Sequence, residues 1–280
     1  MDSINLTGKT CLITGAGTGL ARAMALGLTQ AGAEVLAADI DEAGLAQTVA
    51  LAQGAPGRML AHTLDVRDPA QCEAAVAQAI AAFGHLDILV NCAGLGPVYM
   101  KRNFIEEPLR FWDADPERWW NMIAVNLRGP FLLARAAAPH MIARKWGRIV
   151  NITTSFSTMI RGGNMPYGQT KSGLEAGSAS WADDLAGTGV TVNVLIPGGA
   201  ADTGMIPEES MPDRSKLVAP YAMVAPICYL ASAQSDGVTG KRFVAQSFDP
   251  ASPLAEPGCA PAAWPGLAAG ASKGLGEGTR

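Results

Sequence analysis

A glycine-rich turn between a buried strand and a helix constrains the fold of this chain more than any other feature. Thr10–Thr14 is a short apolar run that is typical of a buried strand. Gly15, Gly17 and Gly19 follow, and a helical pattern covers residues 22–30. Small residues let a backbone approach a phosphate closely, and a helix N-terminus offers unpaired N–H donors. The turn therefore predicts a phosphate-binding cradle at the first strand–helix junction.

The same alternation of strand and helix continues along the chain. Further strands are expected at residues 34–38, 59–64, 88–91, 148–152 and 190–195, and helices at 42–53, 69–82, 116–144 and 166–185. Strands that alternate with helices form a parallel sheet covered on both faces. With a glycine-rich first turn, this pattern predicts an α/β fold, a doubly wound parallel sheet of the Rossmann type that binds a dinucleotide. We expect one domain over residues 1–250.

Composition excludes several classes of protein. The chain is 49% hydrophobic and 16% charged with a net charge of −4, which provides for a core and argues against disorder. It has no Lys/Arg run typical of a nucleic-acid face and no apolar stretch that would span a membrane. The five scattered cysteines indicate reduced thiols in a cytoplasmic protein, with neither disulfides nor a metal site. An early strand-like run leaves no room for a signal peptide.

Three segments interrupt the alternation. Residues 95–115 and 199–220 both follow strands, so both should emerge at the carboxyl edge of the sheet, where ligands bind in such folds. From Pro250 the composition changes to Pro, Gly and Ala, with Trp264 as an isolated large apolar residue. We expect residues 251–280 to form an irregular C-terminal tail outside the fold.

Asp39 indicates which dinucleotide binds. It closes the second expected strand, twenty residues after Gly19, where a carboxylate can accept hydrogen bonds from ribose hydroxyls. A carboxylate there repels a 2′-phosphate, and neither Gly17 nor Thr18 is basic, so the sequence predicts NAD. The alternative is that Asp39 caps the helix that begins near Asp41.

Tyr167 and Lys171 are the candidate catalytic pair. In a helix, residues i and i+4 share a face, so the phenol and the ammonium can meet. A free tyrosine has a pKa of about 10 and is a poor base near neutral pH. A cation beside it favours the phenolate and makes acid–base chemistry accessible. The alternative is a solvated helix face.

Several motifs together resemble the short-chain dehydrogenase/reductase family, over roughly residues 5–248. The resemblance rests on the turn Thr14–Gly19, with Ala21 in place of the last glycine of TGxxxGxG; Leu64-Asp65-Val66; Asn91-Cys92-Ala93-Gly94, with Cys92 in place of the second Asn of NNAG; Asn126; Tyr167 and Lys171 as YxxxK; and Pro197-Gly198.

The resemblance implies specific roles for these residues. The implied cofactor-binding residues are Gly15, Gly17, Thr18, Gly19, Leu20, Asp39, Asp65, Val66, Asn91, Ala93, Gly94, Tyr167, Lys171, Pro197, Gly198 and Thr203. Tyr167 would act as the acid/base, and Lys171 would lower its pKa and bind the ribose. Asn126 would hold a water that links Lys171 to solvent. Thr203 is the weakest assignment, because Gly198–Asp202 is one residue longer than usual.

The family's catalytic serine has no direct counterpart here. It usually stands thirteen residues before the tyrosine, where this chain has Thr154. A threonine hydroxyl makes the same hydrogen bonds, although its methyl group takes space and restricts χ1. Ser155 is the alternative. Thr153 is better explained as a strand-forming residue.

The resemblance implies an NAD-dependent oxidoreductase that interconverts a secondary alcohol and a ketone. A non-catalytic or regulatory NAD-binding protein is the first alternative, suggested by Thr154, Cys92 and Ala21. A sugar-nucleotide epimerase or dehydratase also shares YxxxK, but it usually needs a larger C-terminal domain than the residues after Pro250 would form.

The irregular segments suggest the substrate class. They carry Tyr99, Phe104, Trp112, Met205 and Met211, which suit a hydrophobic or aromatic alcohol. The alternative is that these residues, with Trp119 and Trp120, seal the core. Arg161 could meet an acidic substrate group, remain solvated or pair across a subunit contact.

The resemblance also implies a homotetramer. Close helix packing would use the small residues Gly173, Ala176, Gly177, Ala179 and Ala182, joined by Leu132, Leu133 and the alanines at 136–138. The alternative is that these residues are buried inside the monomer.

Overall fold

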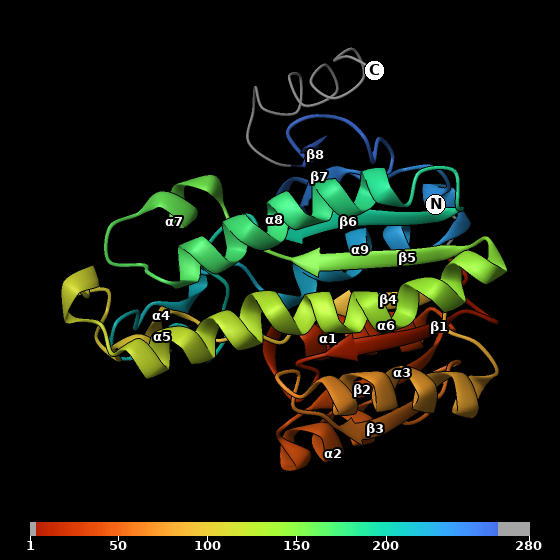
Figure 1. Ribbon diagram of the computed structural model, residues 1–280, viewed down its shortest axis with the longest axis horizontal. Helices are drawn as coiled ribbons and strands as arrows, with labels where there is room; N and C mark the ends of the chain where they lie inside the picture. Colours follow the sequence, from red (N-terminus) through yellow and green to blue (C-terminus); the bar gives the residue numbers. More distant parts are fainter. Residues whose placement is uncertain (1–3, 263–280) are drawn as a thin grey trace, which may run out of the picture.

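An eight-stranded sheet runs through the middle of the molecule in the order β3-β2-β1-β4-β5-β6-β7-β8 (Figure 1). The computed structural model describes residues 4–262. The strands are β1 (Thr10–Thr14), β2 (Glu34–Asp39), β3 (Met59–Thr63), β4 (Ile88–Asn91), β5 (Gly147–Ile152), β6 (Val190–Ile196), β7 (Lys241–Val244) and β8 (Cys259–Pro261). All neighbouring pairs are parallel except β7 with β8. The predicted α/β fold with a parallel sheet is confirmed.

Helices cover both faces of the sheet. They are α1 (Gly19–Gln30), α2 (Glu42–Leu51), α3 (Pro69–Phe83), α4 (Pro97–Met100), α5 (Pro116–Ile123), α6 (Gly129–Arg144), α7 (Phe156–Ile160), α8 (Tyr167–Asp184) and α9 (Val224–Ala231). Figure 1 shows α3, α6 and α8 across one face of the sheet, with α5 and α7 beyond its edge. Helices α1 and α9 pack together in the other core layer, which also contains Leu45 of α2.

The two layers follow from the two-residue period of the strands. In β1, Cys11 and Ile13 belong to the core with α1 and α9, whereas Leu12 belongs to the core with α3 and α6. Successive side chains of a strand point to opposite faces, so a strand buried on both sides is apolar over most of its length. This explains why the expected strands are short continuous apolar runs.

The order of the strands places the binding crevice. The chain moves outward from β1 to β3 and then returns to pair β4 with β1 on its other side. In such sheets the ligand lies beyond the carboxyl ends of the strands, where the winding reverses. The loops after β1 and β4 meet at that point.

The long helix expected at residues 116–144 is divided by a π-helical turn, Ala124–Arg128, between α5 and α6. Asn126 lies in this turn and is fully buried. Single π turns inside helices are frequent at functional sites. The apolar spacing of residues 116–144 did not predict this π-helical turn.

The sheet extends past the boundary expected at residue 250. Strand β8 pairs with β7 through Phe243↔Cys259 and Arg242↔Ala260, and Cys259 is buried. Residues up to 262 therefore belong to the fold, which corrects the expectation that the tail starts at 251. Residues 263–280 with Trp264 lie outside the described residues. Helices α4, α7 and α9 and strand β7 were also not expected.

Part of the expected subunit face is buried inside the monomer. Leu132, Leu133 and Ala137 of α6 and Ala182 of α8 lie in the core beneath these helices. They face the sheet, so they cannot contact another subunit. Ala176 is exposed.

Candidate active site

The glycine turn forms a cradle that only small residues permit. Gly15 has φ +77°, and a Cβ there would lie 2.9 Å from Cα of Ala93. A Cβ on Gly17 would lie 2.9 Å from Oδ2 of Asp39, and one on Gly19 would lie 3.0 Å from Cγ2 of Thr203. The backbone of the turn thus packs directly against β2, the loop after β4 and the loop after β6.

Helix α1 offers uncapped N–H groups to a ligand. Its N-cap residue, Thr18, makes no side-chain hydrogen bond to the first turn, and Leu20 follows in that turn. By contrast, α2, α3 and α5 are each capped by an aspartate side chain. An uncapped helix N-terminus at the glycine turn is a site for a phosphate, so the residues present fit a dinucleotide cofactor.

Asp39 closes β2 beside this turn. Its carboxylate accepts hydrogen bonds from the backbone N–H of Gly17 at 2.8 Å and of Asp41 at 3.0 Å. The cap of α2 is Asp41, whose side chain accepts from Gly44 N, so Asp39 is not a helix cap. A carboxylate has about four acceptor positions. Asp39 therefore retains capacity for ribose hydroxyls.

The loop after β4 is anchored to β1 by Thr14. The Thr14 hydroxyl accepts from Cys92 N at 3.2 Å and from Ala93 N at 3.1 Å. The Asn91 side chain instead is buried and donates to Oδ1 of Asn151 at 2.8 Å. The Asn91 side chain is therefore held in the core by Asn151.

Asp65 and Val66 lie at the expected position after β3. Asp65 is held by Arg67, whose guanidinium contacts both carboxylate oxygens at 2.5 to 3.0 Å and keeps the pKa of Asp65 below its usual range. Val66 is buried and packs against Gly129 at the start of α6. A contact of Asp65 with adenine remains a prediction.

The turn after β6 approaches the cradle from the other side. Gly198 has φ +103°, and Pro197 O accepts from Gln246 N at 3.1 Å. The methyl group of Thr203 packs against Gly19, while its hydroxyl accepts from Met205 N at 3.4 Å. This places Thr203 against the phosphate end of the cradle, and its predicted contact with the carboxamide is not tested.

Tyr167 and Lys171 lie one turn apart at the start of α8, in a helix as predicted. Lys171 is buried and donates to Ile152 O at 2.8 Å, and its Nζ lies 5.9 Å from the centre of the Tyr167 ring. Burial lowers the pKa of Lys171 to about 8. Burial also raises the pKa of Tyr167 to about 12. The expectation that Lys171 lowers the tyrosine pKa is therefore not met by the protein alone.

Thr154 and Ser155 have different partners. Thr154 hydrogen-bonds the Tyr167 side chain, and this bond opposes the rise in the tyrosine pKa. Ser155 is the N-cap of α7, accepts from Thr158 N at 3.2 Å and bonds the hydroxyls of Ser157 and Thr158. The geometry favours Thr154 as the hydroxyl of the site and explains Ser155 as a helix cap.

Asn126 ties the π turn to the loop after β4. Its Oδ1 accepts from Leu95 N at 2.7 Å, and its Nδ2 donates to Leu95 O and to the Thr170 hydroxyl. A Cβ on Gly94 would lie 3.3 Å from Oδ1 of Asn126 and 3.6 Å from Nζ of Lys171. Both side-chain donors of Asn126 are used, so the predicted water would bind its remaining acceptor sites.

The two irregular segments meet above the site. Met205 packs against Gly96, and Arg102 pairs with Glu209 at 2.7 Å. The hydroxyl of Tyr99 accepts from the Asn121 amide at 3.0 Å. The first two contacts join the segment after β4 to the segment after β6, and the third ties the segment after β4 to α5.

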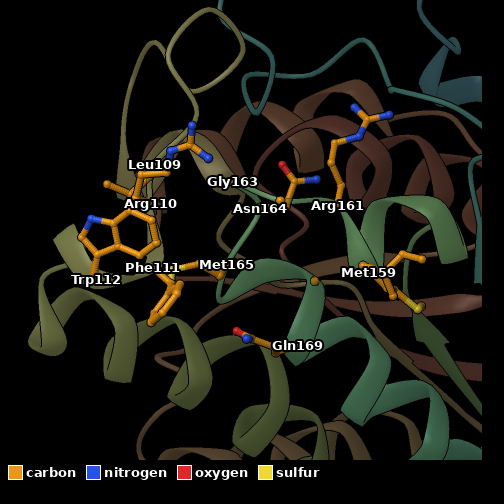
Figure 2. A pocket seen from close by; sticks show the side chains of 13 residues that line it. Leu109, Arg110, Phe111, Trp112, Met159, Arg161, Gly163, Asn164, Met165 and Gln169 are labelled. Carbon is orange, nitrogen blue, oxygen red and sulfur yellow. The ribbon is translucent and has the colours of Figure 1, made fainter.

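A separate pocket of about 380 Å³ lies on the outer side of α7 and the start of α8. Figure 2 shows Arg110, Phe111 and Trp112 on one wall and Arg161 and Asn164 on another. Phe111 and Trp112 are largely exposed, and so is Trp120 of α5, so these aromatic residues do not seal the core. Arg161 lines this pocket, whereas Tyr167 and Thr154 are not among its described lining residues.

The fold brings the Thr154 hydroxyl, the Tyr167 phenol and the Lys171 ammonium to the carboxyl edge of the sheet, beside the glycine turn. Such a set can hold a substrate oxygen and move a proton to or from it. Thr14 was not assigned to the site from the sequence, although its place at the end of a strand next to the glycine turn is a usable signal.

Comparison with known proteins agrees with this arrangement. The family model described as short chain dehydrogenase matches residues 9–213. The 3-oxoacyl-(acyl-carrier-protein) reductase of Thermotoga maritima is 33% identical over 249 residues, which cover 85% of this chain and 96% of that protein. The 2-dehydro-3-deoxy-D-gluconate 5-dehydrogenase of Escherichia coli is 33% identical over 253 residues, 86% of this chain and 94% of that protein.

Solved structures show the same fold. A short-chain type dehydrogenase/reductase from Mycobacterium marinum has a TM-score of 0.76 and 27% identity, covering 87% of this chain and 96% of that one. A structure from Beutenbergia cavernae with NADP bound at low occupancy has a TM-score of 0.75 and 28% identity, covering 87% and 97%. This chain is an oxidoreductase that belongs to the short-chain dehydrogenase/reductase family.

Proposed function

We propose that this protein is an NAD-dependent oxidoreductase that interconverts a secondary alcohol and a ketone, with Tyr167 as the acid/base. The observation that carries the proposal is the contact of Thr154 with Tyr167, one helical turn from the buried Lys171. The set lies beside the glycine turn, since Gly94 lies next to both Lys171 and Asn126.

Each residue has a defined task in this proposal. The bound nicotinamide supplies the hydride acceptor or donor. Thr154 holds the substrate oxygen and stabilises its developing charge. Tyr167 gives a proton to that oxygen in ketone reduction and takes one in alcohol oxidation. With a pKa raised to about 12, the phenol is protonated near neutral pH, which suits reduction.

Asp39 supports NAD over NADP. Its carboxylate lies against the glycine turn, where a 2′-phosphate would meet a like charge. The structure from Beutenbergia cavernae holds NADP, so the choice of cofactor within the family is open to test. We expect Asp39→Ser to relax the preference by removing the charge.

The test is a panel of secondary alcohols and ketones with NAD(H) and NADP(H), followed at the nicotinamide absorbance. We expect turnover with at least one substrate and kcat/KM roughly tenfold or more higher with NAD, the scale of about 1.4 kcal/mol. Equal values with both cofactors would contradict the NAD assignment. Absence of turnover together with tight NADH binding would favour the regulatory alternative.

The substrate pocket suits an apolar or aromatic alcohol or ketone. The side chains of Tyr99, Phe104 and Met205 are partly buried on the two segments that meet above the site. The two relatives above are named for different substrates, 3-oxoacyl-(acyl-carrier-protein) and 2-dehydro-3-deoxy-D-gluconate, so their names do not decide the substrate here.

We further propose a homotetramer in the cytoplasm. Support for the oligomer comes from exposed Ala176 on α8 and Phe131 on α6. Support for a reducing compartment comes from five free cysteines. Among residues 4–262, no helix has the length and apolarity needed to cross a membrane.

A further inference from the structure

A buried ion pair lies behind the catalytic threonine. Glu175 of α8 and Arg242 of β7 are in contact, and their side chains are only 2% and 4% exposed. Taking two charges out of water is unfavourable, and apolar residues of similar volume often replace such a pair with no loss of stability. In addition, Oε1 of Glu175 is buried with no hydrogen-bond partner among the described residues. Stability alone therefore explains this pair poorly.

The contacts of the pair converge on the segment after β5. Arg242 donates from Nη2 to Thr154 O at 2.6 Å, and its guanidinium lies 4.2 Å from the centre of the Phe156 ring. The Thr153 hydroxyl donates to Oε2 of Glu175 at 2.8 Å. Thr153, the carbonyl of Thr154 and the ring of Phe156 therefore all contact one ion pair.

The pair also connects this segment to the helix that carries the other catalytic groups. Glu175 stands one helical turn after Lys171, which itself donates to Ile152 O at 2.8 Å. The end of β5 and the residues after it are thus attached to α8 directly through Lys171 and Glu175, and indirectly through Arg242. These attachments fix the distance between Thr154 and Tyr167.

A threonine needs such an anchor more than a serine does. The methyl group of threonine restricts χ1, so the direction of its hydroxyl is set by the main chain that carries it. A serine could correct a small displacement by changing rotamer. In this chain, a shift of the Thr154 main chain moves the hydroxyl with it.

We propose that Glu175 and Arg242 are positioning residues that hold the Thr154 carbonyl and thereby direct its hydroxyl at Tyr167. Neither residue touches the substrate; both act through Thr154. The effect on turnover rests on the proposed function, whereas the effect on the place of Thr154 does not.

The double variant Glu175→Leu/Arg242→Met separates positioning from stability. We expect it to fold with a modest loss of melting temperature, because an apolar pair fills the same space while the Thr153 hydroxyl and Thr154 O lose these partners. We expect kcat to fall roughly 10- to 100-fold, the scale of a misplaced catalytic group, with KM for NAD within about threefold of the parent value. Arg242→Lys should give an intermediate kcat, because a lysine cannot contact Glu175 and Thr154 O in the same forked geometry.

The matched control is an ion pair at the start of β5, the strand whose other end leads to Thr154. Arg148 of β5 is 2% exposed and pairs with Asp236, remote from the carboxyl edge. The variant Arg148→Met/Asp236→Asn should change the melting temperature while leaving kcat unchanged. A fall in kcat equal to that of the Glu175/Arg242 variant would mean that any ion pair with a buried arginine matters equally, and would overturn the proposal.

Kinetics and crystal structures of the variants test the positioning role of Glu175 and Arg242. A double variant that retains the parent kcat overturns the proposal, and if that variant does not fold, an unchanged kcat in Arg242→Lys does so. Crystal structures of the parent and variant proteins test positioning without turnover. A displaced Thr154 hydroxyl supports the inference even if no substrate is found and the proposed reaction fails. A Thr154 hydroxyl that still contacts Tyr167 in the variant overturns it.

Discussion

Two adjacent hydroxyls, on Thr154 and Ser155, have separate functions at the level of single residues. Thr154 contacts Tyr167, and Ser155 caps α7. We expect Thr154→Ala to lower kcat by about 10²–10³, as for the loss of one donor to a developing oxyanion. Thr154→Ser should retain activity. Ser155→Ala should cost about 1 kcal/mol of stability as a lost cap, with little change in kcat.

Steady-state kinetics and urea unfolding of the three variants with one good substrate test this assignment. Exchange of the two results, with Ser155→Ala inactive and Thr154→Ala mild, would show that the serine fills the catalytic position. A loss below about tenfold in both alanine variants would mean that neither hydroxyl is catalytic.

Lys171 makes the stability of the protein depend on pH. Its pKa is lowered from 10.5 to about 8 by burial, so between these values the unfolded chain holds a proton that the folded protein has released. Stability then rises with pH through this window. Lys171→Met removes the effect, and the parent-minus-variant difference in unfolding free energy should rise by at most about 3 kcal/mol between pH 7.5 and pH 10.

Urea unfolding at pH 7.5 and pH 10 without cofactor measures this difference. The comparison stays at or below pH 10, because Tyr167, with its pKa raised to about 12, contributes with the opposite sign above that value. Parallel stability curves for the parent protein and the variant would show that Lys171 is not perturbed.

At the level of elements, the start of α8 depends on a glycine. A Cβ on Gly168 would lie 2.2 Å from Met159 O, so the first turn of α8 packs directly on the end of α7. Gly168→Ala should force the two backbones apart, cost about 1–3 kcal/mol and reduce kcat, because Tyr167 is the adjacent residue. Gly177→Ala is the matched control on the same helix, where the nearest atom would be 3.7 Å away, on Trp181.

The control should stabilise the protein by roughly 0.5–1 kcal/mol, since alanine favours the helix interior. The melting temperature should therefore fall in Gly168→Ala and rise in Gly177→Ala, and kcat should fall only in Gly168→Ala. Equal effects would mean that the contact of α8 with α7 does not determine where Tyr167 lies.

The sequence predicts those elements whose signal is local. Apolar runs gave β1 to β6 nearly to the residue, because strands buried in a parallel sheet carry mostly apolar side chains. Strand β7 was missed because Lys241 and Arg242 interrupt its apolar pattern, and β8 because three residues in a Pro/Gly-rich segment carry no period. Their pairing brings together residues far apart in sequence, which local patterns do not record.

In the candidate site, too, the sequence predicts the features with a local signal and misses those that depend on the fold. Motif spacing located Tyr167, Lys171, Asp39 and the glycine turn. It could not distinguish Thr154 from Ser155, because that choice depends on where β5 ends and α7 begins. It also could not show that Asn91 turns its side chain into the core.

For the whole molecule, one face carries features of a subunit interface. Helices α6 and α8 lie across the same face of the sheet (Figure 1). Phe131 and Ile142 of α6 are 47% and 40% exposed, and Ala176 of α8 is exposed. Exposed apolar residues gathered on neighbouring helices mark interaction sites more often than isolated ones do.

We therefore expect an assembly through this face, with a tetramer implied by family resemblance. Light scattering at micromolar concentration should give a multiple of the 28.9 kDa chain mass. Ala176→Arg places a long charged side chain where helices would approach closely, so it should yield a smaller species. Leu51→Glu is the control: Leu51 of α2 is 62% exposed but lies away from α6 and α8, so its variant should keep the parent mass. A parent protein of 28.9 kDa would contradict the assembly. An unchanged mass in Ala176→Arg would place the interface on another face.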